Sequence, residues 1–219
     1  MEQNNLHKWL WPTAFVAVVV VLVGLLVLVN NNFQGKPIID VLLTNPINAN
    51  DYTEGNDKSS VTLVEYSDFQ CPACGAYYPL IKKIVEEYKD KIYFAYRHFP
   101  LSQHKNAKIS AYVAEAAGKQ GKFFDMHNMI FDNQLVWSES NDAQKIFTEY
   151  AVKLGLDMEK FNIDIKSKET IQKVDADAIS GVNSGVDSTP SFFLNGKKIE
   201  NPQNYEEFRK IINDAINNS

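Results

Sequence analysis

The chain has 219 residues, of which 45% are hydrophobic and 22% are charged, and this size accommodates one medium-sized domain plus an appendage rather than two full domains. Its formal net charge is −5. An acidic chain without a basic patch is not expected to bind nucleic acid.

The first segment in chain order is strongly apolar. Residues 9–29, WLWPTAFVAVVVVLVGLLVLV, carry no charged side chain, and as a helix they would extend roughly 30 Å, the thickness of the hydrocarbon core of a bilayer. The run is longer than the apolar region of a signal peptide, so we expect an uncleaved transmembrane anchor rather than a cleaved signal. Lys8 precedes the span and the next charge is Lys36, which predicts that residues 1–8 are cytoplasmic and that the rest of the chain is extracytoplasmic.

Residues 30–60 are rich in Asn and are interrupted by Gly and Pro, which is typical of a tether. One short apolar run, IIDVLL at 38–43, is the exception, and the alternative for it is an edge strand added to the domain that follows. We therefore expect the folded domain to cover residues 61–219.

From Val61 onward the pattern alternates between strand and helix. The Asn195-Gly196 pair, set between two short β-rich runs, predicts a hairpin with a type I′ turn. The expected elements are a strand at 61–68, a helix after Cys71, a strand at 91–99, helical segments at about 104–182, a hairpin at 190–199 and a helix at 205–217.

The two cysteines of the chain, Cys71 and Cys74, lie where the first strand passes into the first helix. Pro72 fits the first helical position, where its missing N–H removes no hydrogen bond. Cys71 is thereby predicted at the helix N-terminus, exposed and reactive, where unpaired amides and the helix dipole favour a thiolate. Cys74, one turn further along, is expected to point toward the domain and to be sheltered.

Three interpretations of this pair compete. A structural disulfide between residues three apart closes a very small loop and would add little stability. A zinc site needs about four ligands, and the remaining histidines, His98, His104 and His127, show no second paired spacing. A Cys-x-x-Cys pair on a strand-to-helix turn is typical of redox chemistry, and we favour that interpretation.

Four segments together resemble the DsbA-like thiol-disulfide oxidoreductases, in the branch that often carries an N-terminal membrane anchor. They are EYSDFQCPAC (65–74), YRHFPL (96–101), QGKFFDMHNMIF (120–131) and GVDSTPSFFLNGKKI (185–199), and they occur in order over roughly 61–219. The resemblance implies an α/β, thioredoxin-like fold with an inserted helical domain, preceded here by the predicted transmembrane helix. That element order agrees with the one inferred from the sequence pattern.

The resemblance also implies roles for individual residues. Cys71 would be the nucleophile and Cys74 the resolving cysteine of a redox-active disulfide, without a metal or other cofactor. Pro190 would be a cis-proline facing the disulfide, and the backbone of Thr189 would be free to pair with an extended client peptide. On base rates alone Pro190 would be an ordinary strand-entry proline with a trans bond.

Glu65 matches the buried acid of thioredoxin-like proteins and shares the strand face of Val61 and Leu63. A carboxyl buried there would have a raised pKa and would take the proton of Cys74 when that thiol resolves a mixed disulfide. The alternative is an ordinary solvated strand residue. His98 and His127 are expected to be packing residues, and the aromatic run at 122–131 is expected to be helical core rather than an exposed groove for unfolded chains.

We therefore predict an oxidase that introduces disulfides into exported proteins outside the cytoplasm, recharged by the quinone-linked membrane oxidase that the resemblance implies. Pro72-Ala73 places no histidine between the cysteines, so we expect a mild oxidant. The alternatives are an extracytoplasmic reductase or isomerase, and a non-enzymatic anchored chaperone or metal-handling module on the same fold.

Overall fold

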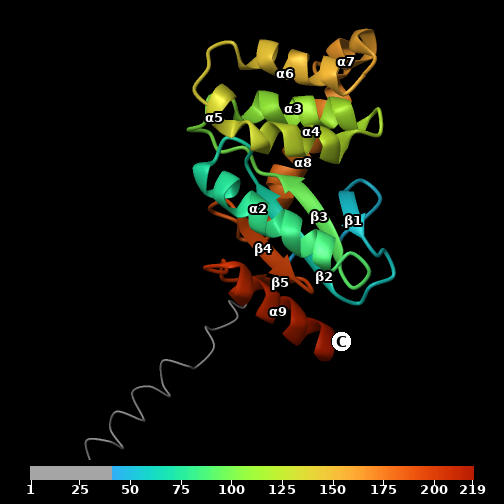
Figure 1. Ribbon diagram of the computed structural model, residues 1–219, viewed down its shortest axis with the longest axis vertical. Helices are drawn as coiled ribbons and strands as arrows, with labels where there is room; N and C mark the ends of the chain where they lie inside the picture. Colours follow the sequence, from blue (N-terminus) through green and yellow to red (C-terminus); the bar gives the residue numbers. More distant parts are fainter. Residues whose placement is uncertain (1–40) are drawn as a thin grey trace, which may run out of the picture. The chain divides into compact units, whose positions relative to one another are not determined.

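The computed structural model describes residues 41–219, which fold around one sheet covered by helices (Figure 1). The predicted cytoplasmic segment 1–8 and the predicted anchor 9–29 lie outside these residues. Within the described part, none of the helices has both the length and the apolar character needed to cross a membrane.

The sheet has the strand order β1-β3-β2-β4-β5. The central strands β2 (Thr62–Ser67) and β3 (Tyr93–His98) run parallel, with Glu65 opposite Tyr96. The other neighbours are antiparallel: β1 (Tyr52–Gly55) with β3, β4 (Ser191–Leu194) with β2, and β5 (Lys197–Ile199) with β4. Because β2 and β3 are covered on both faces, nearly all of their side chains are buried.

Helix α2 (Pro72–Glu87) connects β2 to β3, and α9 (Tyr205–Asn217) closes the chain beside α2. Between β3 and β4 lies the helical insertion. Its helices are α3 (Ala107–Gly118), α4 (Phe123–Asp132), α5 (Gln134–Trp137), α6 (Ala143–Lys153), α7 (Met158–Asp164) and α8 (Lys168–Asn183). Within it, α6 and α7 pack on the layer formed by α3 and α4 (Figure 1). This is the expected thioredoxin-like α/β fold with a helical insertion.

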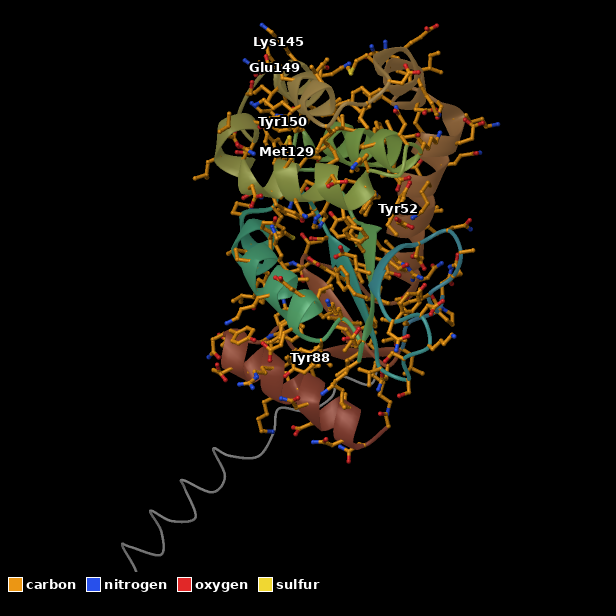
Figure 2. The ribbon with its side chains drawn as sticks, turned by 45° about the vertical axis from the view of Figure 1, so that its right-hand side comes forward. Tyr52, Tyr88, Met129, Lys145, Glu149 and Tyr150 are labelled. Carbon is orange, nitrogen blue, oxygen red and sulfur yellow. The ribbon has the colours of Figure 1, made fainter. Side chains whose placement is uncertain are left out.

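The region expected to be a tether up to residue 60 differs from the prediction in its described part. Residues 41–43 pair with the β4–β5 hairpin, as the alternative of an added edge strand predicts. Strand β1 joins the opposite edge of the sheet, where it pairs with β3. Tyr52 points from β1 to the helical insertion, where its ring stacks on Phe123 at 3.8 Å (Figure 2). The prediction missed β1 because YTEG is too short to show an alternating pattern.

The hairpin prediction is confirmed. Asn195 and Gly196 both have positive φ, 49° and 76°, as a type I′ turn requires, and they connect β4 to β5. The aromatic run at 122–131 is also core as expected, with Phe123, Met126, His127, Ile130 and Phe131 all buried.

The alternation of side chains along β2 and β3 produces two separate cores. Leu63, Phe94 and Tyr96 belong to the larger core, which α2, α4 and α9 cover. Val64, Tyr66, Ala95 and Phe193 belong to a smaller core on the opposite face, which packs against α8. Polar side chains are buried in both cores, and the site lies in the larger one.

Candidate active site

The cysteine pair lies at the N-terminus of α2, as the sequence predicts. Cys71 is the N-cap residue, with extended backbone angles, and Pro72 is the first helical residue. Both sulfurs are free thiols. Cys74 is fully buried, and Cys71 is only 7% exposed, so the expectation of an openly exposed Cys71 is wrong. The loop before β4 covers it, since the Cys71 sulfur lies 3.5 Å from the carbonyl oxygen of Thr189.

The surroundings of Cys71 stabilise its ionised form and lower the pKa of its thiol to about 5. The largest cause is the hydrogen bond that the Cys74 thiol donates to the Cys71 sulfur, which outweighs the opposing effect of burial. Thr189 and the backbone N–H groups of Ala73 and Cys74 lower this pKa further. Cys71 is therefore ionised at neutral pH, as nucleophilic sulfur requires.

Cys74 is held in the opposite state. Burial raises the pKa of its thiol well above the ordinary value, and the hydrogen bond to Cys71 and the negative charges of Cys71 and Glu65 act in the same direction. The Asp68 backbone N–H, 3.5 Å from the Cys74 sulfur, opposes this only in part. The pair thus consists of one thiolate and one thiol, and the thiol needs a base before it reacts.

Glu65 is buried in the middle of β2 at 3% exposure, so the alternative of a solvated strand residue is wrong. Burial raises the pKa of its carboxyl to about 7. The carboxyl lines a pocket of about 380 Å³ that is also bounded by Tyr78 and Lys82 of α2, Glu54 of β1 and His127 of α4. Glu65 therefore lies close enough to Cys74 to affect its ionisation and also borders a space that water can enter.

The Thr189-Pro190 peptide bond is cis, as the resemblance implies. The carbonyl oxygen of Thr189 faces Cys71, while the Thr189 hydroxyl is buried and finds no geometric hydrogen-bond partner among the described residues. Asn201 fixes the next peptide by donating from its side chain to the carbonyl oxygen of Pro190 at 2.8 Å. This arrangement places the backbone of residue 189 directly beside the Cys71 sulfur.

Several polar residues that shape the turn before α2 were not predicted from the sequence. The buried carboxylate of Asp68 accepts hydrogen bonds from the backbone of Gln70 and Leu101 and lies 2.6 Å from Nδ1 of His104. Gln134 of α5 donates to two carbonyl groups of the same turn. Asp68 and Gln70 lie inside the EYSDFQCPAC motif, which could have indicated them, whereas His104 and Gln134 come from distant segments.

His98 and His127 are both buried, as expected for packing residues. His127 is surrounded by aromatic rings, and burial lowers its pKa to about 3, so the ring is neutral. His98 pairs with Glu115 at 3.0 Å, and these two lie together with Asp177 in a group of potential metal ligands. In that group Lys173 lies 2.6 Å from both carboxylate oxygens of Asp177, so an ammonium group already neutralises it.

The comparisons with known proteins agree with this geometry. A family model described as thioredoxin matches residues 48–214. The curated Na(+)/H(+) antiporter NhaA 3 of Salinispora tropica is 32% identical over 181 residues, which are 82% of this chain and 26% of that protein. The chain thus spans about a quarter of the length of the curated relatives it matches.

Two solved structures illustrate the similarity in fold. The crystal structure of alpha-DsbA1 from Wolbachia pipientis superposes with a TM-score of 0.71 at 23% identity, covering 80% of this chain and 95% of that one. BdbD from Bacillus subtilis, in its oxidised form, has a TM-score of 0.68 at 22% identity and covers 82% of this chain and 100% of its own. At these identities the similarity establishes the fold.

Proposed function

The chain belongs to the thioredoxin family, and on that premise we propose that it is a thiol-disulfide oxidoreductase that exchanges a Cys71–Cys74 disulfide with cysteines of exported proteins. The observation that carries this proposal is the asymmetry of the pair, a Cys71 with a pKa of about 5 next to a Cys74 whose pKa is raised. Stabilisation of the Cys71 thiolate favours the reduced form, and a protein whose reduced form is favoured donates its disulfide to others. We therefore propose the oxidase direction.

The proposed reaction starts from the oxidised pair. A client thiolate attacks the Cys71 sulfur, the Cys71–Cys74 bond breaks, and Cys74 leaves as a thiolate that takes up a proton. A second thiolate of the same client then attacks the client sulfur of the mixed disulfide, and Cys71 leaves as a thiolate. Two electrons pass from the client to the cysteine pair, so the client gains a disulfide and this protein is left with two reduced cysteines.

Glu65 is the proposed proton donor to Cys74 in this direction and the proton acceptor in the reverse direction. A carboxyl with a pKa of about 7 is partly protonated at neutral pH and can serve in both roles. The pocket that Glu65 lines provides a route by which the proton exchanges with solvent. A water molecule between Glu65 and Cys74 would complete the relay.

Thr189 and Pro190 are the proposed contact for the client backbone. The carbonyl oxygen of Thr189 lies beside the sulfur that the client attacks, so an extended client segment would lie next to that backbone during exchange. The clients are cysteine-containing exported proteins.

The cellular setting is part of the proposal. We place the domain outside the cytoplasm, held by the predicted anchor at 9–29, because disulfides persist in oxidising compartments. A quinone-linked membrane thiol oxidase is the proposed recharging partner. Ion transport is not part of the proposal, because the chain matches only about a quarter of the antiporters, and the segment that matches the thioredoxin family contains the cysteine pair.

Trapping of the mixed disulfide tests the enzyme proposal. In the full chain, Cys74→Ala keeps the attacking thiolate but removes the group that resolves the adduct, so covalent complexes with many exported proteins are expected on non-reducing gels. Cys71→Ala is the matched control and should form none. The proposal would be falsified if Cys74→Ala trapped nothing and Cys71 were alkylated no faster than a free thiol at pH 6.

The direction is tested by equilibration of the purified protein with glutathione buffers. An oxidase should be more oxidising than the glutathione couple, whereas a potential near that of thioredoxin, about −270 mV, would support the alternative of a reductase.

A further inference from the structure

The short helix α5 is attached directly to the cysteine turn through Gln134. The side-chain nitrogen of Gln134 donates one hydrogen bond to the carbonyl oxygen of Phe69, at 2.7 Å, and one to that of Cys71, at 2.8 Å. A primary amide has two N–H groups, so both are used on the two carbonyls that flank Gln70. Gln134 thereby connects the helical insertion to the backbone of the nucleophile.

Gly75 makes room for this amide. A Cβ atom at residue 75 would lie 2.2 Å from Oε1 and 2.8 Å from Cδ of Gln134, which is far inside van der Waals contact. Gly75 is an ordinary helical residue, so the requirement is for space and not for unusual backbone angles. The amide of Gln134 therefore lies directly against the first turn of α2.

The other contacts of α5 keep Gln134 in place. The Trp137 side chain is fully buried and donates from its ring nitrogen to the carbonyl oxygen of Ile130 at 2.8 Å. The Gln70 side chain donates to the carbonyl oxygen of Ser138 and accepts from the backbone of Asn106, both at 2.6 Å. The insertion thus holds the turn from two sides, at Gln70 and at Cys71.

The carbonyl group of Cys71 accepts a second hydrogen bond, from the backbone of Gly75 at 3.1 Å. The peptide that follows the nucleophile is therefore fixed by one donor from α2 and one from α5. The N–H groups of Ala73 and Cys74, which stabilise the Cys71 thiolate, belong to the same helical turn. Their direction relative to the sulfur depends on how firmly this turn is held.

We propose that Gln134 is a positioning residue whose amide holds the Phe69–Cys71 turn against α2 and thereby sets the stability of the Cys71 thiolate and the oxidising strength of the pair. The inference rests on the proposed thiol-disulfide function. It assigns to the helical insertion a part in tuning the chemistry of a nucleophile that the thioredoxin-like core provides.

Two substitutions of Gln134 separate the hydrogen bonds from charge. Gln134→Met keeps the length of the side chain and removes both donors, while Gln134→Glu turns a carboxylate toward two carbonyl oxygens and adds a negative charge near the thiolate. Gln134→Met should raise the pKa of Cys71 by about half a unit and Gln134→Glu by about one unit. The equilibrium constant for reduction by glutathione should fall about threefold and about tenfold, respectively.

Gln120 offers a matched control within the same insertion. Its side chain also makes two backbone hydrogen bonds, both to Asp157, at 3.1 and 2.9 Å. Gln120→Met should lower the melting temperature about as much as Gln134→Met without changing the thiolate titration, read by its ultraviolet absorbance, or the glutathione equilibrium. Gly75→Ala, which displaces the Gln134 amide from the other side, should shift both readouts in the same direction as Gln134→Met.

The positioning role is overturned if Gln134→Met and Gly75→Ala reduce stability but leave the Cys71 titration and the glutathione equilibrium as in the unmodified protein. Failure of the underlying function looks different. In that case the unmodified protein itself would show no acidic thiolate and no exchange with glutathione, whatever residue stands at 134.

Discussion

The sheet buries ionisable side chains on both of its faces, and the two faces differ in how many hydrogen-bond partners these side chains have. On the face toward α8, the guanidinium of Arg97 is 1% exposed and forms five hydrogen bonds. Two of them go to the carboxylate of Asp51 at 2.8 and 2.7 Å, and others go to Tyr66 and to the backbone of Asn45 and Pro46. Every polar group of this network has a partner of fixed geometry.

On the face toward α2, some buried polar groups have no hydrogen-bond partner. The hydroxyls of Ser67 and Tyr96 are buried and have no geometric hydrogen-bond partner within the described part of the chain. Burial raises the pKa values of Glu65, Cys74 and Tyr96 together, and the charges of the first two raise that of Tyr96 further. A buried polar group without a partner costs stability.

The difference shows how adjacent strand residues serve opposite purposes. Tyr66 and Arg97 lie one position after Glu65 and Tyr96 in the parallel register, so alternation alone sends the two pairs to opposite faces. The Arg97 network stabilises the fold because its charges are fully compensated. The Glu65 carboxyl keeps a raised pKa, which Ser67 lowers only in part, and it is the group that we propose to exchange a proton with Cys74. Perturbed acids of this kind cluster at functional sites.

The largest expected effect on stability comes from removing Arg97 from its buried hydrogen-bond network. Arg97→Met leaves the carboxylate of Asp51 buried without its partner, and loss of one member of a buried pair costs about 3–5 kcal/mol. Thermal unfolding at pH 7 should show a melting temperature lower by on the order of 10 °C. Thiol exchange, measured well below that temperature, should be unchanged.

The exposed pair between Arg209 and Glu87 supplies the control for this substitution. Arg209→Met should change the melting temperature very little, because solvent screens that pair. If Arg97→Met were as mild as Arg209→Met, the buried network would not contribute to stability.

This network was also the part of the fold that the sequence did not predict. Asp51 stands in the segment expected to be a tether, and it meets Arg97 only after β1 pairs with β3, across 46 positions. The hydrophobic pattern of the sequence is local and does not indicate a contact between residues so far apart in the chain. The strands and helices from Val61 onward were predictable, because hydrophobic period, the Asn195-Gly196 turn and Pro72 at a helix start are local features.

The second prediction concerns Glu65, on the face of the sheet toward α2, where a substitution should increase stability instead of lowering it. The folded pKa of Glu65, about 7, lies above its ordinary value of 4.5, so the folded state favours the protonated acid. Stability should therefore fall as pH rises from about 4.5 to 7, by up to about 3 kcal/mol. Glu65→Leu removes this loss and should be more stable than the unmodified protein at pH 8, with the difference smallest at pH 4.

Urea unfolding at the two pH values measures this effect. The rate of disulfide exchange should also fall at neutral pH, because the substitution removes the proposed proton relay. Glu65→Gln, which keeps the size and a polar group but does not titrate, is the matched control. It should lose the pH dependence as well. A protein whose stability is flat between pH 4.5 and 7 would show that Glu65 is compensated after all.

Like the fold, the candidate site has residues that could be predicted from the sequence and residues that could not. Cys71 and Cys74 were predicted from a local feature, their spacing at a strand-to-helix turn. Glu65 was predicted from the family resemblance together with its strand parity, and Thr189 and Pro190 from the resemblance in one short motif. The contacts of His104 and Gln134 depend on how the insertion folds back on the turn before α2. Such positions are fixed by tertiary packing and leave no pattern in the sequence near the cysteines.

The smallest expected effect compares the same substitution on the two faces. Tyr66→Phe removes a hydroxyl that accepts from Arg97 at 3.0 Å and pairs with Ser180 at 2.8 Å, so it should cost about 1–2 kcal/mol. Tyr96→Phe removes a buried hydroxyl that has no such partner in the described structure, so it should be neutral or stabilising by up to about 1 kcal/mol. Urea midpoints with unchanged slopes measure both, and equal losses would mean that the Tyr96 hydroxyl is bonded, for example through water, and that the faces do not differ.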